Sequence, residues 1–149
     1  MCTWTLLEAV NFYQNRGSKV YVTFMDCTKA FDKVRHSTLF TKILGVKIHP
    51  LIVRMLLFTY QNQSAQVCWG GQLSDPFPIR NGVRQGAVLS PILFNLYTSD
   101  LFEILEDNGN GDGLRIEEDY HGIYGYADDL GLLSNTVMGL QRMLDKTAE

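Results

Sequence analysis

Two adjacent aspartates near the C-terminal end of the sequence constrain the fold more than any other feature. Asp128 and Asp129 lie between two short apolar runs, 123–125 and 130–133, a pattern typical of a β-hairpin with the acids at its tip. At a separation of ~4 Å and an effective dielectric of about 20, two carboxylates repel each other by roughly 4 kcal/mol. Such a hairpin needs a cation, solvent or both. Taken alone, the pair fits a polar turn and a divalent metal site about equally well.

Length and composition favour one domain with an acidic balance. The chain has 149 residues, 46% of them hydrophobic, which is enough for one core. The net charge of −3 counts against a complete polymerase with a basic template channel, but not against a catalytic subdomain rich in metal-binding carboxylates. The three cysteines show no CxxC spacing, which indicates a reducing compartment. Without an 18-residue apolar run or a signal peptide, we expect no membrane association and a location in the cytoplasm or nucleus.

Hydrophobic periodicity and turn residues predict an α+β domain. Helices are expected over 3–15, 37–44, 51–62 and 90–107, with a last helix capped by Ser134 or Asn135. Strands are expected over 19–25, 65–69 and 72–79 and on both sides of the two aspartates, and a loop over 108–113. Gly45 is expected at the C′ position of the second helix. After the first helix the order is βααββαββα, which predicts an antiparallel β-sheet with helices on one face.

A third carboxylate, Asp26, ends the strand expected over 19–25. Carboxylates at the ends of neighbouring strands can converge, and oxygen ligands suit Mg²⁺ or Mn²⁺. Two such ions ~3.5–4 Å apart can clamp the attacking and leaving oxygens of a phosphoryl displacement. Taken alone, Asp26 fits a helix cap or a solvated strand end better than a metal ligand, and spacing does not decide between these interpretations.

The segment 81–91 (NGVRQGAVLSP) has the composition of a turn that approaches another group closely. Gly82 and Gly86 allow close backbone approach, and Arg84 and Gln85 supply donors for phosphate, sugar or base. The turn leads into a helix N-terminus, which favours anions. An ordinary strand-to-helix loop is the alternative interpretation.

Together these segments resemble the reverse transcriptases of non-LTR (LINE-type) retrotransposons. Residues 26–34 (DCTKAFDKV) with His36 match the first catalytic motif of that family, 82–94 (GVRQG, LSP and LF) match the second, and 126–129 (YADD) match the third. The three motifs lie in order and cover nearly the whole chain. The resemblance implies a polymerase palm with its catalytic Asp-Asp on a β-hairpin, and the activity of an RNA-directed DNA polymerase.

The resemblance also implies a role for each acid. Asp26 and Asp128 would bridge two Mg²⁺ or Mn²⁺ ions, with the main-chain carbonyl of Cys27 as a further ligand. Asp129 would be an auxiliary acid near the primer 3′ end. The reaction would be attack of a DNA primer 3′-hydroxyl on the α-phosphate of a dNTP, directed by an RNA template.

Five further residues would bind nucleotide or template by the same resemblance. The ring of Phe31 would lie against the sugar 2′ position and favour deoxynucleotides, although core packing is an alternative. Gln85 and Gly86 would line the incoming nucleotide and template, with Arg84 near phosphate and Tyr126 in the same binding site.

Compared with the family, residues 1–149 are expected to be a single partial reverse transcriptase domain, a palm with a piece of the fingers and without most of the fingers and the thumb. These residues alone are therefore not expected to extend a primer. Two alternatives stay open. One is a catalytically incompetent remnant that acts, if at all, as a folding or interaction module, and the other is a group II intron-type maturase.

Overall fold

The chain divides into two compact units. The computed structural model describes the following residues: 2–106, 111–126 and 128–148. The first unit, here called the sheet unit, combines Met1–Thr28 with Thr98–Glu149, and the second, the intervening unit, is Lys29–Tyr97. Among the described residues, no helix is both long enough and apolar enough to cross a membrane.

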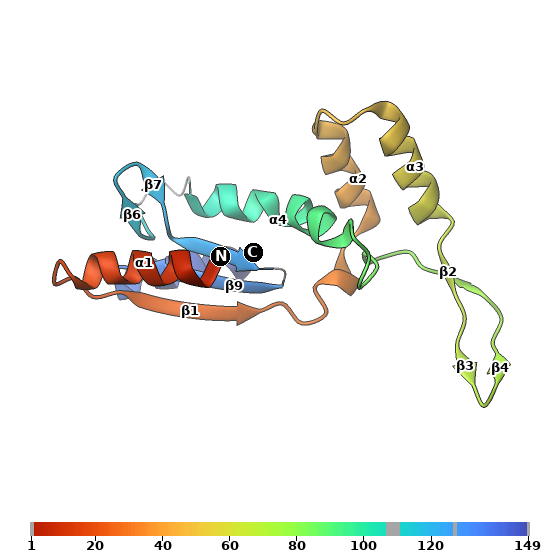
Figure 1. Cartoon of the computed structure of the whole chain (residues 1–149), viewed down its shortest axis with the longest axis horizontal. Coiled ribbons are helices and arrows are strands. Elements are labelled where there is room, and N and C mark those ends of the chain that lie inside the picture. Colours follow the sequence, from red (N-terminus) through yellow and green to blue (C-terminus); the bar gives the residue numbers. More distant parts are fainter. Residues whose placement is uncertain (1, 107–110, 127, 149) are drawn as a thin grey trace. The chain divides into compact units, whose positions relative to one another are not determined.

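The sheet unit is built on an antiparallel sheet of three strands in which segments from both ends of the chain pair. β1 (Tyr21–Asp26) pairs with β9 (Asp129–Ser134), and β9 pairs with β8 (Ile123–Tyr126). β1 and β9 are labelled side by side in Figure 1. The aromatic and β-branched residues of β1 and the leucines of β9 suit such a pleated, half-buried surface. The strand predicted over 19–25 and the hairpin predicted around the two aspartates are therefore confirmed.

Two helices cover one face of this sheet and form the core of the unit with it. They are α4 (Ser90–Glu106), through its C-terminal half, and α5 (Val137–Ala148). The buried side chains that meet there come from both helices and two strands: Leu105, Ile123, Leu132 and Met143. Full burial of an aliphatic side chain contributes about 1.5–3 kcal/mol, so this cluster helps to hold the two helices on the sheet.

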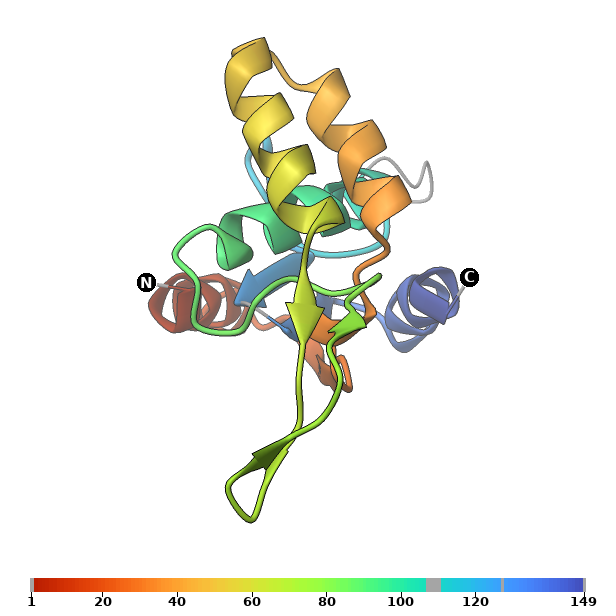
Figure 2. The ribbon, with the colours of Figure 1, turned by 90° about the vertical axis from the view of Figure 1, so that its right-hand side faces the viewer.

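The first helix, α1 (Cys2–Gln14), lies on the opposite face of the sheet. A Cβ built on Gly131 of β9 would lie 3.3 Å from the ring of Phe24 and 3.6 Å from the side chain of Leu6 in α1. Figure 2 shows α1 and α5 on opposite sides of the strands. The predicted α+β fold with an antiparallel sheet is confirmed, but helices cover both faces rather than one. Gly131 permits this because its missing side chain leaves room for Phe24 and Leu6.

Thr136, rather than Ser134 or Asn135, caps the start of α5. The N–H of Gly139 donates to Oγ1 of Thr136 over 3.0 Å, which is the usual bond of an N-cap. Ser134 is instead the buried last residue of β9, and its Oγ accepts a bond from the N–H of Thr136 over 3.3 Å. The predicted helix is confirmed, with its start shifted by one or two residues.

Part of the loop predicted over 108–113 is anchored to α5. Residues 108–110 lie outside the described part of the chain. Asp112 is only 5% exposed and accepts two bonds from the guanidinium of Arg142, one of them from Nε over 2.9 Å. Such bidentate pairs are among the stronger hydrogen-bonded contacts in proteins. The end of this segment is therefore fixed to the helix and is not a polar linker.

A short hairpin that the sequence does not predict precedes β8. It consists of β6 (Arg115–Ile116) and β7 (Asp119–Tyr120), with Glu117 at φ 57° in the turn. The Tyr120 ring packs against the core, and its hydroxyl is buried without a hydrogen-bond partner among the described residues. Burial raises the pKa of Tyr120 to about 12. The folded chain therefore favours the neutral phenol.

We expect Tyr120→Phe to stabilise the chain at alkaline pH relative to the wild type. In the wild type, the raised pKa of Tyr120 contributes fully to the free energy of unfolding below the ordinary pKa of 10. This contribution is lost as the pH rises toward 12, because the tyrosine ionises in the unfolded chain before it ionises in the folded chain. A difference of two pKa units corresponds to roughly 2–3 kcal/mol at most. Urea unfolding of both proteins at neutral pH and between pH 10 and 12 measures this difference. An identical pH dependence of the two unfolding free energies would contradict the prediction.

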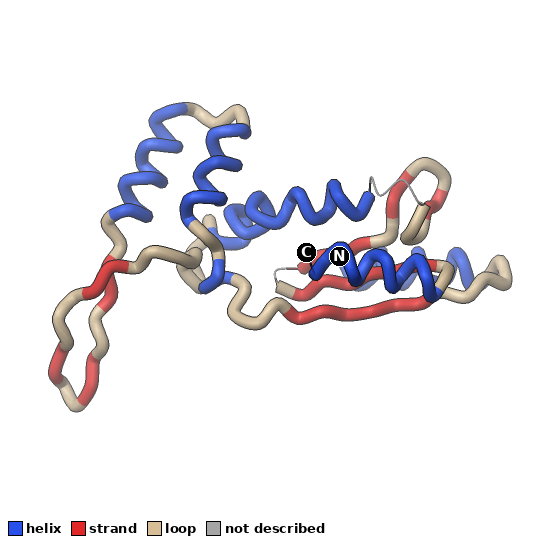
Figure 3. Tube along the Cα trace, turned by 180° about the vertical axis from the view of Figure 1, so that it is seen from behind, coloured by secondary structure: helices blue, strands red, loops and turns tan. Residues whose placement is uncertain are grey.

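The intervening unit contains short helices and two pairs of very short strands. Its elements are η1 (Phe31–Lys33), α2 (His36–Gly45), α3 (Pro50–Gln61), β2 (Ser64–Ala65), β3 (Cys68–Trp69), β4 (Gln72–Leu73) and β5 (Phe77–Pro78). Both predicted helices are confirmed, although Gly45 is the last residue of α2 and not its C′ residue. β3 and β4 are joined by Gly70 and Gly71, whose φ values of 57° and 81° suit a tight hairpin turn. The strands predicted over 65–69 and 72–79 each divide into two short pieces, drawn in red in Figure 3.

Candidate active site

The register of the sheet sets Asp26 and Asp129 opposite each other at one end of the strands. Asp26 is the last residue of β1, Asp129 is the first residue of β9, and the two are direct cross-strand partners. On its other side, Asp129 is the partner of Tyr126 at the end of β8. Directly opposed residues have Cβ atoms roughly 4.5–5.5 Å apart. Two strands that are distant in the sequence therefore bring two carboxyl-bearing residues to one edge of the sheet.

Asp128 joins this edge through its main chain. The N–H of Cys27 donates to the main-chain oxygen of Asp128 over 3.3 Å, just beyond the last paired residues of β1 and β9. Ala127, the remaining residue of the YADD motif, lies outside the described residues. The predicted convergence of Asp26 with the two adjacent aspartates is thus present in the backbone of the sheet unit.

The carboxylates themselves are not gathered into a finished metal site. Within the part of the chain that the structure describes, no three His, Cys, Asp or Glu side chains form a group that could hold an ion. Asp26 and Asp129 are exposed, and opposed like charges repel. The chemistry of the donors nevertheless fits a hard divalent cation, because carboxylate and main-chain oxygens are its preferred ligands. A divalent cation bound between these carboxylates would offset their mutual repulsion.

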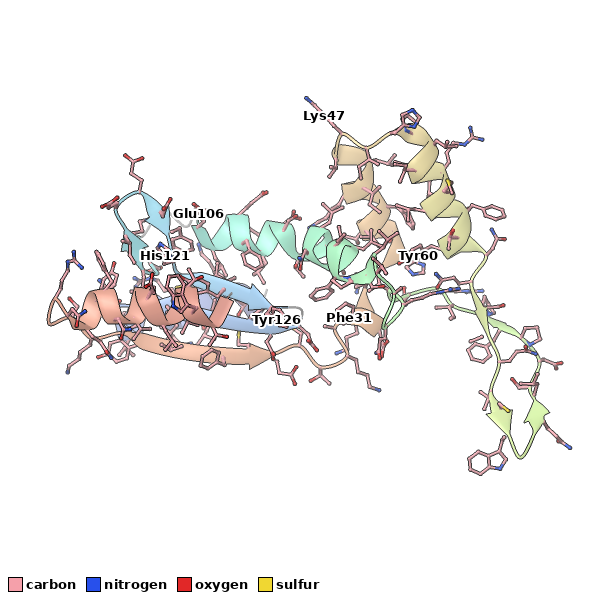
Figure 4. All side chains as sticks on the ribbon, in the orientation of Figure 1. Phe31, Lys47, Tyr60, Glu106, His121 and Tyr126 are labelled. Carbon is pink, nitrogen blue, oxygen red and sulfur yellow. The ribbon has the colours of Figure 1, made fainter. Side chains whose placement is uncertain are left out.

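A pocket of about 640 Å³ opens beside these acids on the face of the sheet that carries α1. The rings of Phe24, Tyr124 and Tyr126 line it together with the two opposed aspartates. Phe24 is 72% and Tyr126 is 75% exposed, so both rings are available to a bound molecule. Tyr124 is fixed more firmly, because its hydroxyl lies 2.6 Å from Nδ1 of His121. Figure 4 labels Tyr126 and His121.

In the intervening unit, the turn that contains Gly82 is packed against η1. The N–H of Gly82 donates to the oxygen of Val34 over 2.7 Å, and the N–H of Val83 donates to the oxygen of Phe31 over 2.8 Å. Gly82 has φ +89°, and a Cβ there would lie 3.1 Å from main-chain atoms of η1. Both the backbone conformation and the close approach require glycine.

Phe31, also labelled in Figure 4, is a packed residue that keeps some exposure. Its ring stacks on the ring of Phe94 in α4, with centroids 4.9 Å apart and an interplanar angle of 29°. Stacked aromatic pairs contribute about 0.5–1.5 kcal/mol beyond their buried area. The core-packing interpretation of Phe31 is therefore supported, and the remaining exposure leaves a ligand contact possible.

Arg84, Gln85 and Gly86 form the exposed part of the same turn. The hydroxyl of Ser90, at the start of α4, donates to the main-chain oxygen of Arg84 over 2.5 Å and ties the turn to the helix. Burial raises the pKa of Tyr60, while a hydrogen bond with Ser90 and the charge of Arg84 oppose that rise. The turn thus presents a guanidinium and an amide next to the N-terminus of a helix, where anions are favoured.

Two residues of the first motif hold this turn, although the sequence assigns neither of them a role. Nε2 of His36 lies 2.8 Å from the main-chain oxygen of Gly82, and Nε2 of Gln85 donates to Oδ1 of Asp32 over 3.1 Å. These contacts join segments about fifty positions apart and leave no periodic signal. Their membership of the first motif was the only sequence signal that could have pointed to them.

The predicted site residues therefore form two groups. One lies at the end of the sheet in the sheet unit: Asp26, Cys27, Tyr126, Asp128 and Asp129. The other lies around one turn of the intervening unit: Phe31, Arg84, Gln85 and Gly86.

Comparison with known proteins identifies the family. A profile of the family described as "Reverse transcriptase (RNA-dependent DNA polymerase)" matches residues 2–149. The chain belongs to the reverse transcriptase family. As a family, reverse transcriptases use divalent metal ions and act with nucleic acid and nucleotides.

Relatives of this reverse transcriptase include proteins of non-LTR retrotransposons. The Pol polyprotein of the retrotransposable element R2DM from Drosophila melanogaster is 33% identical over 129 residues, which are 87% of this chain and 12% of that protein. The RNA-directed DNA polymerase from the mobile element jockey of Drosophila funebris is 28% identical over 149 residues, which are 96% of this chain and 15% of that protein. The chain thus spans less than a sixth of the length of either relative, and the predicted resemblance to non-LTR elements is confirmed.

A solved structure shows the same fold. An apo telomerase from Candida tropicalis, truncated from its C-terminal domain, matches 98% of this chain with a TM-score of 0.67 and 20% identity, and the match covers 30% of that protein. The fold is therefore that of a polymerase palm.

Proposed function

We propose that this reverse transcriptase chain is the catalytic palm segment of an RNA-directed DNA polymerase from a non-LTR retrotransposon. The proposal treats residues 1–149 as a single partial domain, a palm with a piece of the fingers. Its main support is the direct opposition of Asp26 and Asp129 in the antiparallel sheet, with Asp128 bonded to the residue after Asp26. Acids drawn together from two distant segments, despite their repulsion, are expected at a metal-dependent phosphoryl-transfer site.

In this proposal Asp26 and Asp128 would hold two Mg²⁺ or Mn²⁺ ions, with the main-chain oxygen of Cys27 as a further donor. Ions bound there would lower the pKa of the primer hydroxyl and stabilise the charge that develops at phosphorus. Asp129 lies across from Asp26 and acts as an auxiliary acid near the primer 3′ end.

The remaining site residues select and orient the substrates. Arg84 offers a guanidinium to phosphate, Gln85 and Gly86 face the nucleotide and template, and Tyr126 presents a largely exposed ring beside the acids. Phe31 is stacked on a neighbouring ring, so a sugar with a 2′-hydroxyl would meet a side chain that cannot easily move. The primer 3′-oxygen then bonds to the α-phosphorus of a dNTP, the bond to the β-phosphate breaks, and pyrophosphate leaves.

Primer extension tests this proposal. The polymerase that contains these residues is given an RNA template, a DNA primer and labelled dNTPs, with and without a chelator. We expect extension that follows the template, stops when the divalent ion is removed and returns when Mg²⁺ is restored. Ribonucleotides should be poor substrates. Absence of template-directed extension, or extension unaffected by the chelator, would refute the proposal.

A further inference from the structure

The end of the first motif and the turn of the second motif form one hydrogen-bonded assembly, here called the turn clamp. It comprises residues 31–36 and 81–85 of the intervening unit. Two main-chain bonds of 2.7 and 2.8 Å hold Gly82 and the following residue, and the ring nitrogen of His36 lies 2.8 Å from the Gly82 oxygen. Arg35 and Asn81 add an isolated antiparallel bridge. The backbone of the turn is therefore held at several points.

The base of the turn clamp is also packed from behind by aromatic rings. The His36 ring meets the rings of Tyr60 and Phe40 edge-on, with centroid distances of 5.1 and 6.5 Å, and both partners are buried. The position of His36, and through it that of the Gly82 oxygen, is fixed by this packing. Because the backbone of the turn is held in this way, the exposed residues of the turn can change mainly the orientation of their side chains.

The side-chain amide of Gln85 can adopt two orientations, which exchange the positions of its nitrogen and its oxygen. The two ends of a glutamine amide have similar shapes but opposite chemistry, because the nitrogen only donates and the oxygen only accepts. An ionised carboxylate only accepts. Asp32, which receives a bond from Nε2 of Gln85 over 3.1 Å, therefore permits one of the two amide orientations and disfavours the other. The amide oxygen of Gln85 is then the end that does not contact Asp32, and it can accept a bond from a ligand.

We propose that Asp32 is a positioning residue for nucleotide selection, which sets the orientation of the Gln85 amide and thereby makes its oxygen an acceptor toward the incoming nucleotide or the template base. The identity of the substrate in this inference rests on the proposed function, whereas the hydrogen bond between Asp32 and Gln85 does not. Asp32 itself is not a catalytic residue, because it acts only through Gln85. Phe31 is the neighbour of Asp32 in the same clamp, and its main-chain oxygen accepts a bond from the N–H of Val83. The residues proposed to contact the base and the sugar are therefore held by one hydrogen-bonded segment.

Kinetics of an Asp32→Ala variant of the polymerase test the inference. Loss of a hydrogen bond to a charged group should raise the KM for dNTP about tenfold, while kcat stays within about threefold and the Mg²⁺ requirement is unchanged. Asp32→Glu, which keeps a carboxylate at an exposed site, should recover most of the loss. In a Gln85→Ala background, Asp32→Ala should have no further effect. Asp75→Ala, which removes another exposed acid of the same unit, is the matched control and should behave as the wild type.

A spectroscopic measurement keeps this inference separate from the proposed function. In the NMR spectrum of the chain, the side-chain amide signals of Gln85 should shift in Asp32→Ala and remain unshifted in Asp75→Ala. An inactive wild type would refute the proposed function, while the NMR result would still decide whether Asp32 holds Gln85. Unshifted Gln85 signals, an unchanged KM, or additive effects of Asp32→Ala and Gln85→Ala would overturn the inference. A purely structural role would instead lower the Tm of Asp32→Ala without the KM-selective loss.

Discussion

In the polymerase that contains these residues, Asp128→Asn is expected to reduce RNA-templated primer extension by about three orders of magnitude or more, since the charge stabilisation at stake is several kcal/mol. Asparagine keeps the size of the side chain and one oxygen, but it removes the negative charge that would attract a divalent cation. The main-chain bond from Cys27 to the Asp128 oxygen does not depend on the side chain, so the edge of the sheet should be preserved.

The free energy of unfolding of Asp128→Asn should not fall with its activity. Asp128 adjoins two exposed acids that already oppose each other across the sheet, so removal of its charge relieves repulsion. We therefore expect an unfolding free energy equal to or slightly above that of the wild type. Loss of activity with unchanged or raised stability is the usual signature of a residue kept for function.

Asp119→Asn provides the matched control for Asp128→Asn. Asp119 is an exposed acid of β7 in the same unit and has the same side chain. Its variant should extend primers within about twofold of the wild type, as expected for a surface charge. If Asp128→Asn retained more than a tenth of the wild-type rate while folding normally, Asp128 would not be a metal-binding acid.

The acidic half of the site was predictable because its signals are local. Asp128 and Asp129 lie between two apolar runs, and Asp26 directly follows a strand rich in β-branched and aromatic residues. The residues of each segment are enough to predict where its strand ends. No local pattern predicts that β1 pairs with β9, because the two segments are far apart in the sequence and their apolar faces would suit many partner strands. The resemblance to the family implied that Asp26 and Asp128 share a metal site, and the structure supplies the pairing of β1 with β9.

Other features depend on tertiary contacts and could not be predicted in this way. Gly131 makes space for Phe24 and for α1 on a face of the sheet that was predicted to lack helices. His36 and Asp32 hold a turn about fifty positions away in the sequence, and such contacts leave no periodicity. Polar contacts of single side chains are decided by the final packing, whereas helices and strands are decided largely by neighbours in the sequence.

Leu132→Ala should strongly destabilise the sheet unit, with a loss of about 2–5 kcal/mol of unfolding free energy. Leu132 has no exposed surface and lies in the core cluster with Leu105 and Met143, on the strand that begins with Asp129. Its truncation removes transfer free energy and leaves a cavity between the sheet and the two helices α4 and α5. Urea unfolding monitored by circular dichroism measures the loss.

The same substitution at an exposed leucine separates burial from residue type. Leu73 of β4 is 65% exposed, and Leu73→Ala should change stability by less than about 0.5 kcal/mol. If both variants lost equal stability, the cluster around Leu132 would not be the core that holds the sheet. Because β9 carries Leu132 in the middle and Asp129 at its end, a weakened core should also loosen the pairing of Asp129 with Asp26. Hydrogen exchange at the β1–β9 amides should then rise in Leu132→Ala, and the geometry of the candidate metal site would depend on an apolar contact that never touches a substrate.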